Sequence, residues 1–191
     1  DAGYFIRDLY YPYVGMENQT LGRPSHFGLW VDGQFAWLDN PEWQRELAYE
    51  EDTLVTDVKL LNERLQIRLR CHDAVDFDRD VYIRRIDVEN CCGSAREVRL
   101  FFHHNFHIAG TEYGDTAYFD PRHRALVHYK GKRWFMCNVA LEDVARDGWD
   151  AFATGTKEID GKEGTWRDAE DGRLEGNPIA QGSVDSTGQV T

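Results

Sequence analysis

Hydrophobic and polar residues alternate with a period of two through much of this chain. From Leu65 to Cys71 the apolar residues take every second position, and Gln66, Arg68 and Arg70 lie between them. Successive side chains of a β-strand point to opposite faces, so this pattern predicts a strand with one buried face. Similar patterns predict further strands at residues 53–61, 81–89, 116–120, 125–130, 133–139 and 149–156.

The clearest local signal is a hairpin at residues 27–38. Two segments rich in aromatic residues, 27–31 and 35–38, flank an Asp32-Gly33 pair. Asp-Gly supplies the positive φ angles that a tight hairpin turn requires. A longer alternation over residues 97–108 predicts one long strand, with His103 and His107 on the same face.

Two parts of the chain depart from the strand pattern. Residues 41–50 predict a short helical turn, with Asn40 as its cap and Pro41 in the first helical position. Beyond Lys157 the alternation weakens into a polar, glycine-rich segment, which we expect to form loops rather than core. We therefore predict an all-β fold of two stacked antiparallel sheets, with 1–157 as the main sandwich and 158–191 as a polar segment of the same domain.

The charge of the chain narrows the range of partners. The 191 residues are enough for one domain with a sizeable core, and the formal net charge is −12. A negative surface repels phosphate backbones and anionic lipid, so we expect neither nucleic acid nor a membrane as a partner. Neutral partners such as sugars fit better, although acidity is equally typical of a surface that only keeps a protein soluble.

The cysteines and known cofactor motifs indicate no redox or metal chemistry. Cys71, Cys91, Cys92 and Cys137 form no C-x-x-C pair, and the two adjacent cysteines are poorly placed to bridge each other. We interpret all four as reduced thiols of a cytoplasmic protein, with secretion as the alternative. The sequence contains no P-loop, no G-x-G-x-x-G and no G-x-S-x-G, and we expect no cofactor and no metal.

Histidines and acidic residues provide the first candidates for chemistry. His103 and His107, with Glu112 nearby, could serve in acid–base exchange. On one strand the two histidines would lie about 13 Å apart, too far for one metal ion, and they could equally line a polar sheet face. The acidic run of Asp73, Asp76, Asp78 and Asp80 lacks the pattern of an EF-hand, so we interpret it as a solvated turn.

Two polar segments that are rich in aromatic residues are candidates for binding. Tyrosine rings and planar polar side chains suit sugar binding or a wet interface, while the alternative is a structured loop. The candidates in the first segment, 6–20, are Arg7, Asp8, Tyr10, Tyr11, Tyr13, Glu17 and Asn18. Those in the second segment, 164–186, are Trp166, Arg167, Asp168 and Asn177.

Six segments together resemble the N-terminal domain of prokaryotic glycoside hydrolase family 15 proteins, which include glucoamylases, glucodextranases and related trehalases. They read IRDLYYPYVGMEN, FGLWVDGQFAWLD, CHDAVDF, EVRLFFHHNFHI, DTAYFDP and GTWRDAEDGRLEGNPIAQGSVDS, in the family's order and over nearly the whole chain. The resemblance implies an antiparallel super-β-sandwich, similar to galactose mutarotase. It also implies a following (α/α)6 barrel that carries the catalytic glutamates, so no catalytic residue is carried over to this chain.

The resemblance implies an accessory role in an enzyme that hydrolyses α-glucosidic bonds in α-glucans or trehalose. The candidate residues of both polar segments would face the barrel or the glycan. Compared with the family pattern, we expect the sandwich to be incomplete at both ends, which would expose sheet edges and favour a homo-oligomer. Two alternatives stay open: a free carbohydrate-binding module that uses Trp30, Trp37, Trp43 or Trp166, and a mutarotase- or epimerase-like enzyme that uses His103, His107 and Glu112.

Overall fold

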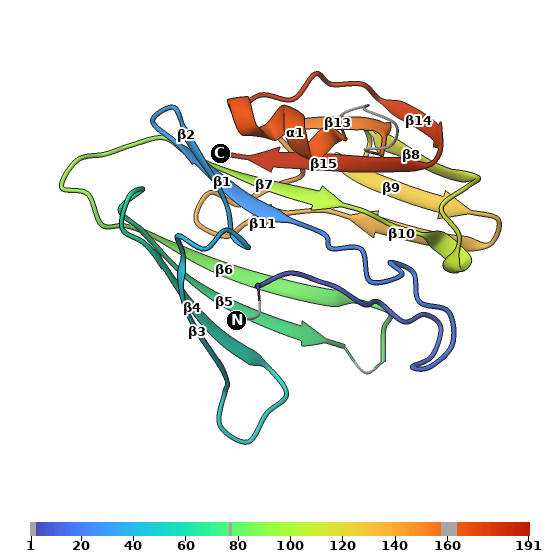
Figure 1. Cartoon of the computed structure of the whole chain (residues 1–191), viewed down its shortest axis with the longest axis horizontal. Coiled ribbons are helices and arrows are strands. Elements are labelled where there is room, and N and C mark those ends of the chain that lie inside the picture. The colour runs from blue at the N-terminus through green and yellow to red at the C-terminus, as the bar shows by residue number, and fades with distance from the viewer. Residues whose placement is uncertain (1–2, 77, 158–163) are drawn as a thin grey trace. The chain divides into compact units, whose positions relative to one another are not determined.

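A computed structural model describes residues 3–76, 78–157 and 164–191, and the fold is all-β with antiparallel strand pairs (Figure 1). The chain divides into two compact units. The first unit comprises Asp1–Asp39 and Glu97–Thr191, and the second comprises Asn40–Arg96. The antiparallel all-β prediction is therefore confirmed.

The first unit contains two principal sheets. A five-stranded sheet has the order β13 (Ala151–Thr156), β15 (Val184–Val190), β7 (Val98–His104), β1 (Phe27–Val31), β2 (Gln34–Trp37). A four-stranded sheet has the order β10 (Arg133–Cys137), β9 (Ala125–Lys130), β8 (Asp115–Asp120), β14 (Ile179–Gly182). Short elements complete the unit: β11 (Ala140–Leu141), β12 (Arg146–Asp147), α1 (Thr165–Asp168) and the 3-10 turns Ile108–Gly110 and Ala169–Asp171.

Side chains from the two sheets of the first unit meet in a shared core. Phe119 on β8 stacks on Phe152 of β13, with ring centroids 3.8 Å apart. His128 on β9 and Ser186 on β15 form a buried hydrogen bond of 2.7 Å between Nε2 and Oγ. These contacts make the first unit a two-layer sandwich, in which aromatic pairs add packing energy beyond the area that they bury.

The predicted hairpin is confirmed as β1 and β2. Gly28 pairs with Trp37 and Val31 with Gln34 across an antiparallel ladder. Asp32 and Gly33 form the turn with φ angles of 50° and 82°. Both angles are positive, as a two-residue type I′ connection requires, so local chemistry determines this register.

A largely polar strand, β15, lies inside the larger sheet, contrary to our prediction that the segment beyond Lys157 is too polar for core. All seven residues of β15 are buried, between β13 on one side and β7 on the other. Its polar side chains have partners: Asp185 bonds His103, Ser186 bonds His128, and Thr187 bonds Thr165. Burial is tolerated because each group exchanges water for a hydrogen bond within the protein. The first part of the predicted segment, residues 158–163, lies outside the described residues.

The prediction of one continuous strand over 97–108 is also wrong. β7 ends at His104, and the chain then leaves the sheet. The backbone N–H of His107 donates to the carbonyl oxygen of Gln19 at 2.6 Å, and a 3-10 turn begins at Ile108. Within β7 the alternation is as expected, since Phe101 and His103 are buried together.

The second unit is a four-stranded sheet of sequential hairpins, β3 (Gln44–Tyr49), β4 (Thr56–Asn62), β5 (Ile67–Val75) and β6 (Tyr82–Asn90). Residues 44–49 are a strand rather than the predicted helical turn, because their backbone pairs with β4 from Gln44–Leu61 to Tyr49–Thr56. The alternation from Leu65 to Cys71 is confirmed. All four apolar residues are at most 2% exposed, while Arg68 and Arg70 are exposed.

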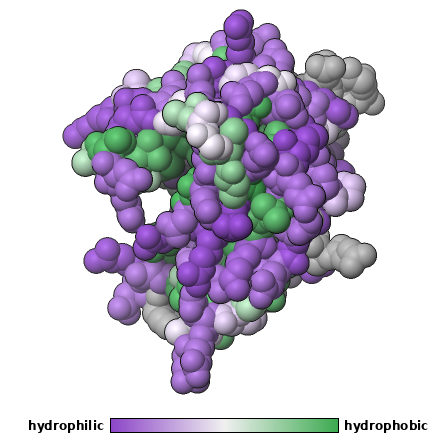
Figure 2. All heavy atoms as spheres, turned by 90° about the vertical axis from the view of Figure 1, so that its left-hand side faces the viewer, coloured by the Kyte–Doolittle hydropathy of each residue, from purple (hydrophilic) through white to green (hydrophobic). Residues whose placement is uncertain are grey.

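Figure 2 shows one face of the molecule, on which hydrophilic residues predominate and hydrophobic residues form separate patches. Among the described residues, none of the helices has the length and apolar character needed to cross a bilayer. Of the cysteines, Cys71 is buried and Cys91 is exposed.

Candidate functional site: a histidine-lined cavity in the first unit

A cavity of about 390 Å³ opens within the first unit. Segments far apart in the sequence form its walls. Arg23, Pro24 and His26 come from the chain entering β1, and His103, Asn105 and His107 come from the end of β7 and the segment after it. The remaining lining residues are Glu112, Lys157, Trp166 and Asp185.

A buried pair, His103 and Asp185, forms the inner wall of the cavity. The two side chains are each 2% exposed, and Nε2 of His103 lies 3.1 Å from a carboxylate oxygen of Asp185. Burial lowers the pKa of His103 despite this carboxylate, so the imidazole is neutral at pH 7. A carboxylate only accepts, so Nε2 carries the proton and Nδ1 carries a lone pair.

The same carboxylate orders the start of α1. Both oxygens of Asp185 lie 3.2 Å from the backbone N–H of Thr165, the first residue of this short helix. Thr165 also bonds Thr187 through the two hydroxyls, at 2.9 Å. The buried strand β15 thereby positions the neighbouring Trp166 at the cavity.

An aromatic stack forms another wall. The ring of His26 stacks on His103, with centroids 5.5 Å apart, and on Trp166, with centroids 5.7 Å apart. The guanidinium of Arg167 lies 4.1 Å from the Trp166 ring centroid, a cation–π contact. His26 is oriented by Asp39, whose carboxylate lies 3.1 Å from Nδ1. These contacts hold the rings in place and restrict their rotation.

Lys157 brings an amine to the cavity from the end of β13. Its side chain is buried and donates a hydrogen bond to the carbonyl oxygen of Phe106. Burial lowers the pKa of Lys157 to about 8, although Asp115, Asp185 and Glu112 oppose the shift. Burial, together with the positive charge of Lys157, lowers the pKa of His107 to about 4. At pH 7 the cavity therefore contains the largely protonated amine of Lys157 and the neutral imidazoles of His103 and His107.

The structure brings together some of the candidates from the sequence. His103, His107, Glu112 and Trp166 all line this one cavity, because the chain turns after His104 instead of continuing as a strand. The estimate of about 13 Å along a strand therefore does not apply to the histidine pair.

The candidates of the first polar segment lie in a loop outside the cavity, and several of them bond one another. Arg7 and Asn18 both donate hydrogen bonds to the Asp8 carboxylate, each at 2.6 Å. The backbones of Tyr10 and Asn18 form an isolated antiparallel β-bridge. Glu17 receives two hydrogen bonds from Arg133 of β10, at 2.9 and 3.1 Å. These contacts fasten the loop to the four-stranded sheet.

The aromatic residues of this loop differ in their exposure. Tyr11 packs edge-on against Phe135 of β10 and lies beside the Arg133 guanidinium. Tyr10 is 44% exposed, and the loop tip is more exposed still, with Tyr13 at 72%, Val14 at 91% and Met16 at 63%. The loop therefore presents an apolar tip on a fixed base.

The second polar segment is divided by the structure. Trp166, Arg167 and Asp168 form α1, whereas Asn177 lies beyond it and ties the chain to β13. The Asn177 side-chain amide donates to the carbonyl oxygen of Thr154 at 2.7 Å, and the Thr154 N–H donates to the carbonyl oxygen of Asn177 at 3.0 Å. These two hydrogen bonds attach Asn177 to β13, at a position separate from α1.

Of the four tryptophans proposed for sugar stacking, two are buried and a third is covered by an arginine side chain. Trp37 and Trp43 are buried, at 5% and 3% exposure. Trp30 packs under the Arg99 guanidinium, 4.3 Å from its ring centroid. Only Trp166 lines the cavity.

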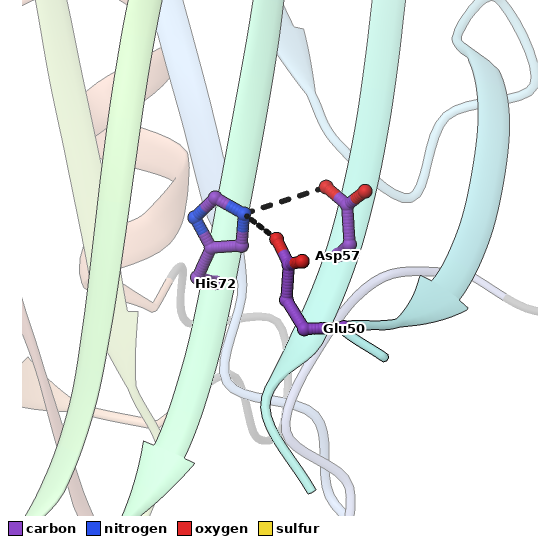
Figure 3. A group of neighbouring side chains, drawn as sticks. All are labelled: Glu50, Asp57 and His72. Carbon is purple, nitrogen blue, oxygen red and sulfur yellow. Dashed lines mark ion pairs between the residues drawn. The ribbon is translucent and has the colours of Figure 1, made fainter. Parts of the chain in front are cut away.

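A second cluster of polar groups lies in the second unit (Figure 3). Nε2 of His72 lies 3.1 Å from Glu50 and 3.4 Å from Asp57, and the three ligand atoms lie within 4.8 Å of one another. These ligand types can bind a divalent transition metal. However, Arg70 also pairs with Asp57 at 2.8 Å and Glu50 at 3.1 Å, and its hydrogen bond lowers the pKa of Asp57. Because a guanidinium already compensates both carboxylates, we interpret the cluster as an ion-pair network.

Of the acidic run, Asp73 lies within β5, and Asp76, Asp78 and Asp80 follow that strand. Asp73 accepts hydrogen bonds from Tyr82 at 2.6 Å and Arg84 at 2.7 Å, on the neighbouring strand β6. Asp76 accepts from the backbone N–H groups of Asp78 and Arg79, both at 2.9 Å. The bonds of Asp76 match the interpretation as a turn between strands, whereas for Asp73 the interpretation is wrong because this residue pairs with Arg84 in the sheet.

Six cavity residues escaped the sequence interpretation as site residues: Arg23, Pro24, His26, Asn105, Lys157 and Asp185. Each lies in a segment whose pattern suggested something else, such as a strand end or a polar loop. The available signal for Asp185 was that it is the one charged residue within residues 176–191. Its pairing with His103 spans 82 positions and is decided by strand order.

Comparison with known proteins shows a similarity of fold. No family model and no curated protein matches the chain. Among solved structures, a bacterial glucoamylase complexed with acarbose superposes with a TM-score of 0.77 at 14% sequence identity. The match covers 98% of this chain but 27% of the glucoamylase chain. This chain therefore has the fold of one part of a bacterial glucoamylase.

Proposed function

We propose that the chain is a non-catalytic, N-terminal accessory domain of a glycoside hydrolase family 15-like enzyme, which packs on the (α/α)6 barrel and helps shape it. One observation carries the proposal: nearly the whole chain superposes on about a quarter of a glucoamylase chain. The sequence resemblance points to the same parent, with α-glucans or trehalose as the substrate of the full-length enzyme.

The N-terminal loop supports an interdomain role. Its tip exposes Tyr13, Val14 and Met16, while Glu17 and Arg133 hold its base. Aromatic residues and methionine are enriched at protein interfaces, and a preorganised loop loses little entropy on docking. Arg7, Asp8, Tyr10 and Asn18 would form the polar rim of this contact, and Arg167 and Asp168 are further candidates on α1.

The first test is hydrolysis by the chain alone. We expect no release of glucose from maltooligosaccharides or trehalose, whereas the natural full-length protein should hydrolyse one of them. Cleavage by the isolated chain, or a full-length protein without a helical barrel, contradicts the proposal.

The second test addresses the loop in the full-length protein. A Val14→Asp, Met16→Asp double variant should lower the thermal stability of the barrel, because charge at the interface core is costly. Leu54→Asp is the matched control, since Leu54 is 83% exposed in the second unit. Equal effects of both variants would reject a docking role for the loop.

A sugar-ring enzyme of the mutarotase or epimerase type is the second candidate function. It is favoured by the placement of His103, His107 and Glu112 around one cavity. Neutral imidazoles can exchange protons with a hemiacetal. Polarimetry on freshly dissolved α-glucose should then show acceleration that His107→Ala abolishes and His123→Ala, at an exposed site, retains. An uncatalysed rate with the wild-type chain rejects this candidate.

A further inference from the structure

Two hydrogen-bond acceptors that belong to cavity-lining residues have no partner among the described residues. They are Nδ1 of His103 and Oδ1 of Asn105. Both atoms are buried, and both residues line the cavity. Leaving a buried polar atom without a partner costs about 1–3 kcal/mol, so such atoms in a cavity indicate the chemistry of a ligand.

The character of these two atoms is determined by their neighbours. Nε2 of His103 donates to Asp185, which leaves a lone pair on Nδ1. A ligand that satisfies His103 and Asn105 must therefore donate hydrogen bonds to both.

The cavity is lined by two acidic and two basic residues, so neither sign of charge predominates. Asp185 and Glu112 are acidic, and they would repel a carboxylate or phosphate. Lys157 and Arg23 are basic, and they would repel an ammonium group. Opposite charges that face one space favour a neutral ligand with both donors and acceptors, and hydroxyl groups have both.

The volume of the cavity suits a ligand of the size of one sugar ring. About 390 Å³ lies near the lower end of the range for small-molecule sites. Trp166 and Pro24 add apolar surface to an otherwise polar wall. A pyranose combines these properties, because it has hydroxyl groups around its edge and C–H groups on its faces.

We propose that this cavity binds a single neutral pyranose, with Nδ1 of His103 and Oδ1 of Asn105 accepting hydrogen bonds from its hydroxyl groups. The choice of glucose as the probe rests on the proposed function, since an α-glucan or trehalose hydrolase releases glucose. The binding itself belongs to the first unit and requires no barrel.

The test is an NMR titration of the whole isotope-labelled chain with D-glucose. We expect saturable shifts of the Trp166 indole and of the His103 and His107 rings. Asn105→Leu removes one acceptor and should weaken binding about tenfold. Asn138→Leu, at an exposed position outside the cavity, is the matched control and should bind like the wild type.

Two charged analogues of the same size test the electrostatic argument. Glucuronate and protonated glucosamine should both bind more weakly than glucose, because each places a charge near a like charge. Tighter binding of either analogue, no saturable shift with glucose, or an unaltered affinity in a folded Asn105→Leu variant would overturn the inference. Loss of the accessory role in the full-length protein would leave these titrations unchanged, so the two proposals fail separately.

Discussion

Asp185 on β15 accepts a hydrogen bond from Nε2 of His103 on β7 at 3.1 Å, and both side chains are buried. The bond joins this largely polar strand to the wall of the cavity. It also determines which ring nitrogen carries the proton. A residue within the core thereby sets the hydrogen-bonding character of the candidate site.

Replacing this carboxylate should reverse the tautomer of His103. In Asp185→Asn the amide can donate to Nε2, so we expect the proton to move to Nδ1, with a loss of about 1–3 kcal/mol in the free energy of unfolding. Long-range ¹⁵N–¹H correlations report the tautomer, and urea unfolding reports the stability. Asp143→Asn, at an exposed position, should change neither. An Nδ1–H tautomer in the wild-type chain would contradict the assignment.

The free energy of unfolding should fall on mild acidification. The pKa of His107 is lowered to about 4, so the unfolded chain binds more protons than the folded chain between pH 4 and its unfolded value of 6.5. This stabilisation is complete above pH 6.5 and is lost as the pH falls toward 4. The lowered pKa of His128 acts in the same direction, while the raised pKa of Asp115 opposes it.

A variant of His107 and a control variant without a titratable group isolate this contribution. His107→Gln should reduce the proton uptake on unfolding near pH 5 by about one proton. Asn138→Gln, which replaces an exposed side chain that does not titrate, should leave the slope of stability against pH as it is. Urea unfolding at a series of pH values measures both slopes, and equal slopes for His107→Gln and the wild type would refute the prediction.

Close packing of β15 should make Gly188 intolerant of any side chain. A Cβ atom at this position would lie 2.5 Å from Cδ2 of Trp149, which is itself buried. We expect Gly188→Ala to cost about 1–3 kcal/mol of unfolding free energy, as overpacked cores do. Gly93→Ala is a useful comparison, because its Cβ would have no neighbour within 4 Å and should have little effect. Thermal unfolding of both variants tests the difference.

The ion pair between Glu17 and Arg133 should control the order of the N-terminal loop. Glu17→Gln removes the charge that holds the loop base to β10, so hydrogen exchange of residues 7–18 should accelerate. Because the pair is at the surface, the global stability should change little. Glu42→Gln breaks the comparably exposed pair with Arg64, which also has two hydrogen bonds, and should not affect the loop. Unchanged exchange in Glu17→Gln would show that other contacts hold the loop.

Local patterns in the sequence determined much of the fold. The alternation from Leu65 to Cys71, the Asp32-Gly33 turn and most of the strand positions follow from side-chain period and turn chemistry, which act over a few residues. The same local character explains the wrong prediction for residues 41–50. Their helix-cap signal acts over a few residues, and the backbone hydrogen bonds to β4 stabilise a strand there instead.

Only the tertiary structure decided the place of β15 and the composition of the cavity. The sequence of a polar strand resembles that of a loop, so β15 could be recognised only from its hydrogen-bond partners. These partners come from other parts of the chain and are His103, His128 and Thr165. The cavity likewise combines residues from Arg23 to Asp185, which strand order and the turn after His104 bring together. Burial makes a polar residue acceptable only when its hydrogen bonds are satisfied, and that depends on the whole sheet rather than on its own sequence neighbours.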